Sequence, residues 1–159
     1  MTARKLLTGR GEQLSAMLVL ATTRHAGQFD KGGKPYILHP LAVMYLLGEK
    51  ADEIDRCIAL GHDLVEDTDT TYEELRDLGF CDEIIEGIRA LTKVPGETHT
   101  EYKAKVKANA RAVRVKKCDL THNTDIRRLR GATPKDMART ERYFHFYLEL
   151  LALEEEPAK

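Results

Sequence analysis

Residues 52–70, DEIDRCIALGHDLVEDTDT, decide how the rest of the chain is read. Apolar residues recur at helical spacing from residue 52 to residue 67, so this stretch predicts one helix. On a helical wheel the apolar stripe consists of Ile54, Cys57, Ile58, Leu64 and Val65. The opposite face carries His62, Asp63, Glu66 and Asp67. The stretch therefore predicts a helix buried on one side, with a histidine and three acids together on the other.

The acids have two explanations. A solvated face is one, since Asp52, Asp55 and Arg56 lie on the same side of the helix. However, acids in a last helical turn are opposed by the helix dipole, and spacings of three and four residues bring like charges close together. A bound divalent cation would remove both penalties, and histidine with carboxylates is a suitable ligand set. The pattern therefore indicates a metal site as the alternative to a solvated face.

The remaining sequence predicts further helices and offers little sign of strands. Capping boxes at Thr70–Glu73 and Thr98–Glu101 mark two helix starts, and Pro40 marks another directly after His39. The expected helices cover about residues 11–25, a segment from Pro40, then 71–79, 82–92, 99–108, 110–122, and a last one from Thr133-Pro134 through the apolar run YFHFYLELLAL. We expect an all-α fold of about seven helices, with the apolar run in the core or in a helix–helix contact.

The 159 residues suit one domain, over residues 1–159, with a core over about 11–153 and a frayed tail at 154–159. A net charge of −1 favours neither a nucleic acid nor a membrane as partner, and no apolar stretch reaches transmembrane length. The basic segments 103–117 and 127–130 form no single stripe, so they indicate a solvated face or a funnel for an anionic nucleotide. Three cysteines without a CxxC pair are typical of reduced thiols in the cytoplasm. The sequence is compatible with a homo-oligomer.

A metal needs more ligands than His62 and Asp63. His39, fixed at a helix start, and Asp119, among basic residues near a helix end, are the candidates. The other histidines compete for this role: His25, His99, His122 and His145. We expect His99 and His145 to be structural or solvated, because a lone histidine is more often that than a ligand.

In this order, His39-Pro40, His62-Asp63 with Glu66-Asp67, and Asp119 with Asn123 resemble the HD-domain metal-dependent phosphohydrolases. More narrowly, they resemble the RelA/SpoT-type alarmone hydrolases and their small stand-alone relatives. The matching stretches are AGQFDKGGKPYILHPLAV, ALGHDLVEDTDTTYEEL, LTKVPGETHTEY and VKKCDLTHNTDIRRL.

The resemblance implies a divalent metal, usually manganese, held by His39, His62, Asp63 and Asp119. It implies that Glu66 and Asp67 orient and deprotonate the attacking water. It places Asn123 at the ribose, Lys31 near the base or the phosphates, and Arg139 at a phosphate. The implied reaction removes the 3′-pyrophosphate of (p)ppGpp and leaves GDP or GTP.

Three positions depart from the family pattern. Asp30 stands where members usually have an arginine that stacks on guanine, Gly61 replaces a leucine, and Cys118 lies beside Asp119 in KKCD instead of KLAD. Asp30 leaves open a phosphohydrolase for another nucleotide, such as an adenine alarmone, a nucleotide 3′-phosphate or NADPH. A non-catalytic nucleotide-binding module is the third possibility. Nothing in the sequence explains Gly61.

Overall fold

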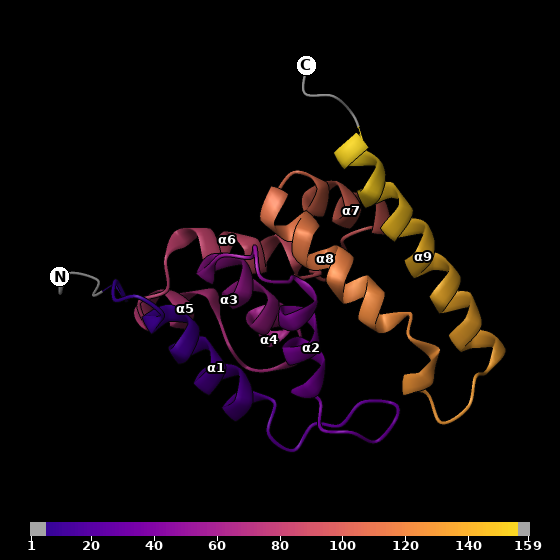
Figure 1. The fold of residues 1–159 in the computed structure, drawn as a ribbon, viewed down its shortest axis with the longest axis horizontal. Coiled ribbons are helices and arrows are strands. Elements are labelled where there is room, and N and C mark those ends of the chain that lie inside the picture. Colours follow the sequence, from indigo (N-terminus) through magenta and orange to yellow (C-terminus); the bar gives the residue numbers. More distant parts are fainter. Residues whose placement is uncertain (1–5, 156–159) are drawn as a thin grey trace.

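Nine α-helices and one 3-10 turn make up the regular structure of residues 6–155, the part of the chain that the computed structural model describes (Figure 1). The helices are α1 (Glu12–Arg24), α2 (Leu38–Leu46), α3 (Glu53–Gly61), α4 (Leu64–Asp67), α5 (Tyr72–Asp77), α6 (Asp82–Leu91), α7 (His99–Lys107), α8 (Ala110–Asn123) and α9 (Pro134–Glu155), with the 3-10 turn η1 (Ile126–Arg128) before α9. An isolated bridge between Phe29 and Pro35 is the sole β-type pairing in that part. The predicted all-α fold is confirmed.

Local sequence signals start several of these helices. Thr98 forms a complete capping box with Glu101 at the start of α7. The side chain of Thr71 accepts a hydrogen bond from the Glu74 amide, and that of Asn109 accepts one from the Ala112 amide. Each bond satisfies an amide that has no partner within its helix. The predicted capping box at Thr98–Glu101 is confirmed, whereas the cap of α5 is Thr71 with Glu74, one residue later than the predicted box at Thr70–Glu73.

Helix α3 is the centre of the domain, with α1, α2, α6 and α8 packed around it (Figure 1). Cys57, Ile58, Ala59 and Leu60 are fully buried on it. Burial on so many sides leaves little of α3 for solvent. The residues at its two ends are therefore held by the surrounding helices.

Two glycines allow this close packing. A Cβ atom on Gly61 would lie 2.7 Å from Cδ1 of Ile88 and 3.0 Å from Sδ of Met17. On the facing helix, a Cβ atom on Gly87 would lie 2.3 Å from Cδ1 of Ile58. Gly61 is thus explained: it lets α1 and α6 approach α3 directly before His62.

A buried carboxylate ties α3 to α8. Asp55 on α3 is 4% exposed and accepts two hydrogen bonds from Arg114, at 2.9 and 3.0 Å. Arg111 donates to the same carboxylate at 2.7 Å. Both arginines precede Asp119 on α8, so these bonds fix the position of Asp119 relative to α3.

The predicted helix over residues 52–67 is wrong in one respect, because it breaks at His62 and Asp63 into α3 and α4. Nδ1 of His62 bonds the Ala59 carbonyl at 2.6 Å, the acceptor that the Asp63 amide would use in an unbroken helix. The prediction that His62 shares one face with Glu66 and Asp67 is wrong as well. His62 turns inward and is 4% exposed, whereas Glu66 and Asp67 stay exposed on α4.

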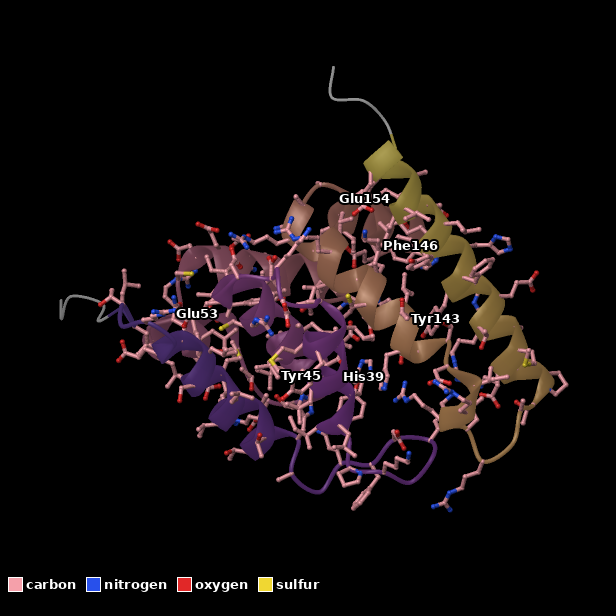
Figure 2. The ribbon with its side chains drawn as sticks, in the orientation of Figure 1. His39, Tyr45, Glu53, Tyr143, Phe146 and Glu154 are labelled. Carbon is pink, nitrogen blue, oxygen red and sulfur yellow. The ribbon has the colours of Figure 1, made fainter. Side chains whose placement is uncertain are left out.

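Helix α9 lies along one side of the domain against α8 (Figure 1). Phe146 and Leu150 are buried, while Phe144 and Leu148 are 53% and 44% exposed, so the apolar run contributes one stripe to the core. Figure 2 shows Phe146 on the inner side of α9, where its ring meets that of Tyr102 on α7. The helix reaches Glu155, and residues 156–159 of the expected tail lie outside the described residues. Among residues 6–155, no helix has the length and apolar character that a membrane crossing requires.

Replacement of Gly61 by leucine should lower the free energy of unfolding by about 2–3 kcal/mol, because the added side chain must displace buried atoms. Gly131→Leu is the matched control, since a Cβ atom on Gly131 meets nothing within 4 Å. Urea unfolding of both variants measures the difference. Equal stabilities of the two variants would show that α3 does not depend on close approach at Gly61.

Candidate metal centre

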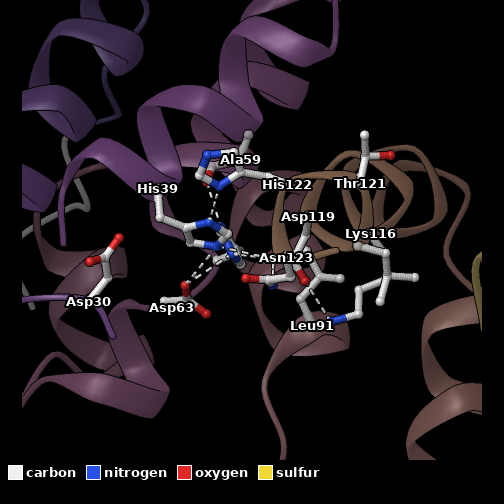
Figure 3. A network of polar contacts seen from close by, with 12 residues as sticks. Asp30, His39, Ala59, Asp63, Leu91, Lys116, Asp119, Thr121, His122 and Asn123 are labelled. Carbon is white, nitrogen blue, oxygen red and sulfur yellow. Dashed lines mark hydrogen bonds and ion pairs between the residues drawn. The ribbon is translucent and has the colours of Figure 1, made fainter. Parts of the chain in front are cut away.

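Three buried side chains converge at one point, and Figure 3 shows two of them, His39 and Asp119. His39 on α2, His62 next to α3 and Asp119 on α8 each offer an atom within 4.8 Å of the other two. Nε2 of His39 lies 3.0 Å from Oδ1 of Asp119, and Nε2 of His62 lies 3.5 Å from the same oxygen. The side chains of all three are at most 5% exposed. The core of the domain thus holds a compact cluster of two imidazoles and one carboxylate.

The environment of His62 fixes which ring nitrogen faces this cluster. A backbone carbonyl can only accept, so Nδ1 of His62 carries the proton that bonds the Ala59 oxygen. In a neutral ring, Nε2 then holds a lone pair. Nε2 is buried and makes no hydrogen bond. A buried, unsatisfied nitrogen with its lone pair turned toward a carboxylate is the arrangement that a metal ion completes.

A second histidine, His122, contacts the ring nitrogen of His39 that faces away from the cluster. The Nδ1 atoms of His39 and His122 lie 2.7 Å apart, so one of them donates to the other. Burial, with the nearby charge of Arg128, lowers the pKa of His122 to about 4. A neutral His122 can accept from His39, and Nε2 of His39 then presents its lone pair to the cluster. Pro40 is the third residue of α2, not the first as expected. An amide at the third position would have no partner within the helix, so a proline there costs no helical hydrogen bond.

Each oxygen of the Asp119 carboxylate accepts a hydrogen bond from a neighbour on its own helix. Lys116 donates to Oδ2 at 2.7 Å, and Nδ2 of Asn123 donates to Oδ1 at 2.7 Å (Figure 3). These two residues stand three positions before and four positions after Asp119, on the same face of α8. The ion pair with Lys116 compensates for burying the charge, so the carboxylate stays ionised inside the protein.

Asp63 stands beside the two histidines. Its Oδ2 atom lies 3.1 Å from Nε2 of His62 and 3.6 Å from Nε2 of His39. The hydroxyl of Tyr36, in the loop before α2, donates to the same oxygen at 2.6 Å. Burial and the charge of Asp63 raise the pKa of Tyr36, so this phenol keeps its proton and remains a donor.

The cluster attracts positive charge. Burial acts to lower the pKa of His62, but the carboxylates of Asp63 and Asp119 outweigh it and hold that pKa well above its ordinary value. Burial acts to raise the pKa of Asp119, but Lys116 and the two histidines hold it well below its ordinary value. Two carboxylates therefore favour one added cation, which is a proton on His62 or a metal ion in its place. The donors present fit a divalent ion.

Glu66 and Asp67 lie on α4, one turn beyond Asp63, and both reach solvent. Oε1 of Glu66 accepts a hydrogen bond from the Lys93 amide at 2.7 Å. Partial burial raises the pKa of both acids, and the charge of Asp63 raises each of them further. Such acids bind a proton more readily than ordinary carboxylates, as general bases in enzymes do.

A cavity of about 320 Å³ opens beside the cluster. Tyr36 and Asn123 line it. Tyr36 bonds the carboxylate of Asp63 and Asn123 bonds that of Asp119, so the cavity lies next to the candidate metal centre there. The other wall carries Lys31 and Arg139, which converge on Asp136 at 3.8 and 3.1 Å. The structure thus brings three residues expected to bind substrate to one cavity. Its volume suits a small ligand.

Several residues at this site were not predicted. Tyr36 and Lys116 stand three positions before His39 and Asp119, but nothing in their types or spacing distinguishes them from ordinary loop and helix residues. Gln28 links two parts of the site, because its side chain bonds both His25 and the backbone carbonyl of Asp67. His99 and His145 are exposed and lie away from the cluster, as expected of non-ligands.

Comparison with known proteins places this geometry in a family. The family model described as "HD domain" matches residues 17–130, a range that holds His39, His62, Asp63 and Asp119. The chain is 36% identical over 133 residues to a probable GTP pyrophosphokinase of Mycobacterium leprae, covering 77% of this chain and 16% of that protein. It is 32% identical over 123 residues to the bifunctional (p)ppGpp synthase/hydrolase SpoT of Escherichia coli, covering 70% of this chain and 18% of that protein.

A third relative is the guanosine-3′,5′-bis(diphosphate) 3′-pyrophosphohydrolase of Vibrio cholerae, 34% identical over 137 residues that cover 80% of this chain and 19% of that protein. The chain spans less than a fifth of the length of these three relatives. One similar solved structure is described as a metazoan ortholog of SpoT that hydrolyses ppGpp and plays a role in starvation responses. It has a TM-score of 0.71 and 25% identity, covering 91% of this chain and 88% of that one. The chain belongs to the HD-domain family, in which its relatives carry the names of ppGpp synthases and hydrolases.

Proposed function

We propose that this protein is a manganese-dependent phosphohydrolase that removes the 3′-pyrophosphate of (p)ppGpp. The oxygen of water adds to the phosphorus next to the ribose, and the bond from that phosphorus to the 3′ oxygen breaks. The 3′ oxygen takes up a proton, so the products are GDP or GTP with a free 3′-hydroxyl and a separate pyrophosphate. The observation that carries this proposal is the buried cluster of His39, His62 and Asp119 with its unsatisfied histidine nitrogen, next to a cavity of about 320 Å³ that Asn123 and Tyr36 line. A cytoplasmic location fits the nucleotide substrate and three free cysteines.

We assign the metal ion to His39, His62, Asp63 and Asp119. The two imidazoles and Asp119 supply one atom each within ligand range of one another, and Oδ2 of Asp63 lies next to both histidines. When bound, a divalent ion supplies Lewis acidity toward a phosphoryl oxygen and toward water. Manganese is our choice because the family that the motifs resemble usually carries it, and because the two carboxylates suit this ion.

Glu66 and Asp67 would take the proton of the attacking water. Their raised pKa values fit a base that must hold a proton and release it again. The Lys93 amide donates a hydrogen bond to the Glu66 carboxylate, and the Gln28 side chain donates one to the backbone carbonyl of Asp67. The two acids thus stand on an anchored turn at the edge of the cluster.

On the substrate side, Asn123 would contact the ribose, because it lines the cavity next to Asp119. From the opposite wall, Lys31 would contact the base or the phosphates, and Arg139 would contact a phosphate. Lys31 is 64% exposed, so it can reach a ligand as that ligand enters.

A second candidate keeps the reaction but changes the nucleotide. The carboxylate of Asp30 lines the cavity and pairs with Arg128 instead of offering a positive charge from the loop. An adenine alarmone, a nucleotide 3′-phosphate or NADPH is therefore the alternative substrate. A non-catalytic module is disfavoured, since the ligand candidates and both acids are present.

The Asp63→Ala variant should lose more than 100-fold in manganese-dependent release of pyrophosphate from ppGpp, because one proposed ligand is gone. Asp69→Asn should keep full activity: Asp69 lies in the same acidic stretch but is 83% exposed and pairs with Arg24. A phosphate-release assay coupled to pyrophosphatase measures both variants.

The same assay with a nucleotide panel separates the two candidates. A tenfold preference for ppGpp in kcat/KM removes the alternative substrates. No turnover of any purine 3′-phosphate or 3′-diphosphate by the manganese-loaded protein, with metal bound, would falsify the proposal.

Tyr36→Phe should weaken manganese binding or lower kcat by about 10-fold, because the Asp63 carboxylate loses the hydroxyl that orients it. Tyr45→Phe is the control, since Tyr45 on the neighbouring helix α2 is 73% exposed (Figure 2). Calorimetric titration with manganese and steady-state kinetics measure the two effects. If both variants match the wild type, Tyr36 does not position Asp63.

A further inference from the structure

Two segments far apart in sequence form a wall of the cavity beside the candidate metal centre. They are the loop of residues 28–36 and the segment of residues 125–130. Their backbones touch: a Cβ atom on Gly32 would lie 2.3 Å from the carbonyl oxygen of Arg128. Nε of Arg130 donates to the Gly32 carbonyl at 2.8 Å. Asp30 adds an ion pair with Arg128 across the same junction. The two segments are therefore fixed relative to each other.

The three arginines of this segment have different surroundings. Arg127 is 88% exposed and pairs with Asp125 at the surface. Arg130 holds the loop backbone. Arg128 is only 20% exposed and lines the cavity. The basic run that suggests a solvated face in the sequence thus sends one guanidinium inward.

The N–H edge of Arg128 is largely occupied by the protein. Nη1 donates to the His122 carbonyl at 2.9 Å and to Oδ1 of Asn123 at 3.3 Å. Nη2 donates to Oδ2 of Asp30 at 3.4 Å. These contacts use three of the five N–H groups that a guanidinium has. A guanidinium with its edge bonded in this way offers a ligand mainly its planar face.

Within the described part of the chain, that face has no aromatic partner. None of the cation–π contacts found within residues 6–155 involves Arg128. The planar guanidinium stacks readily on aromatic rings, and a nucleobase is such a ring. Phe29 and Tyr143 line the same cavity and add apolar surface for a flat ligand.

Asp30 explains why Arg128 is held in one plane. The Asp30 side chain is 13% exposed, and Oδ1 accepts from the Lys34 amide at 2.9 Å. Its other oxygen faces Arg128, so the carboxylate is engaged on both sides and is not free to read a base. Asp30 is therefore a positioning residue. An arginine at position 30 would place two like charges together and would release Arg128 instead of restoring a binding group.

We infer that Arg128, held flat by Asp30, is the stacking surface for the nucleobase of the substrate. This inference rests on the proposed function and extends it, since it names the residue that binds the base. Stacking uses the π-face that every base has, so Arg128 would bind purine nucleotides without distinguishing guanine from adenine.

Calorimetric titrations of the manganese-loaded full chain test this inference with two probes, GDP and inorganic pyrophosphate. Arg128→Lys keeps the charge and loses the planar guanidinium, and Arg128→Gln replaces the guanidinium with a smaller, neutral amide. Both variants should bind GDP about tenfold more weakly and pyrophosphate as tightly as the wild type does. Arg127→Lys and Arg127→Gln are the matched controls, and neither should change binding of either probe.

Three results would overturn the stacking role. The first is GDP affinity that Arg128→Lys retains and Arg128→Gln loses, which indicates a charge contact with phosphate. The second is a tenfold loss for pyrophosphate, which indicates an effect on the metal centre. The third is a wild type that binds pyrophosphate but not GDP. Binding is measured without turnover, so a wild type that binds both probes but hydrolyses no ppGpp would remove the proposed function alone.

A double-mutant cycle tests Asp30. Asp30→Asn should weaken GDP binding about threefold when Arg128 is present and should have no further effect in the Arg128→Lys background, because it acts through Arg128. Pyrophosphate binding should stay unchanged in all of these variants. Independent, multiplying effects of the two substitutions would show that Asp30 does not position Arg128.

Discussion

A fully buried carboxylate, Asp119, is the constraint on which this structure depends. A charge in the core must be compensated, and α8 supplies Lys116 and Asn123 for this purpose. The remaining side of the carboxylate meets His39 and His62, so α2 and α3 must pack where their histidines reach it. Asp55 and Gly61 set that packing, the first by bonding α8 and the second by admitting α1 and α6.

The site combines a rigid interior with walls built from loops. His39 and Asp119 lie in helices, His62 directly follows α3, and all three are buried, so their relative positions are fixed by the core. The cavity next to them is bounded by the loop of residues 28–36 and the segment of residues 125–130, joined through Asp30 and Arg128. This division fits the proposed function, in which residues of the core would hold the metal ion and loop residues would select the nucleotide.

The sequence predicts those features that neighbouring residues determine. Thr98 marks the start of α7 correctly because its bonds span three residues, whereas the cap of α5 lies at Thr71, one residue after the predicted Thr70. The break at His62 was not predicted, since it depends on an inward turn that tertiary packing imposes. The pairing of Asp30 with Arg128 joins residues 98 positions apart, and no local pattern reveals it. The order of the motifs indicated a metal site, whereas the supporting bonds of Tyr36 and Lys116 emerge only when the helices meet.

The central claim is that His39, His62, Asp63 and Asp119 bind one divalent ion. A crystal structure of the manganese-loaded protein, with an anomalous difference map recorded at the manganese absorption edge, tests it most directly. We predict a single strong peak in contact with Nε2 of both histidines and with the carboxylates of both aspartates. A peak at other residues, or an empty cluster in a protein saturated with manganese, would contradict the account.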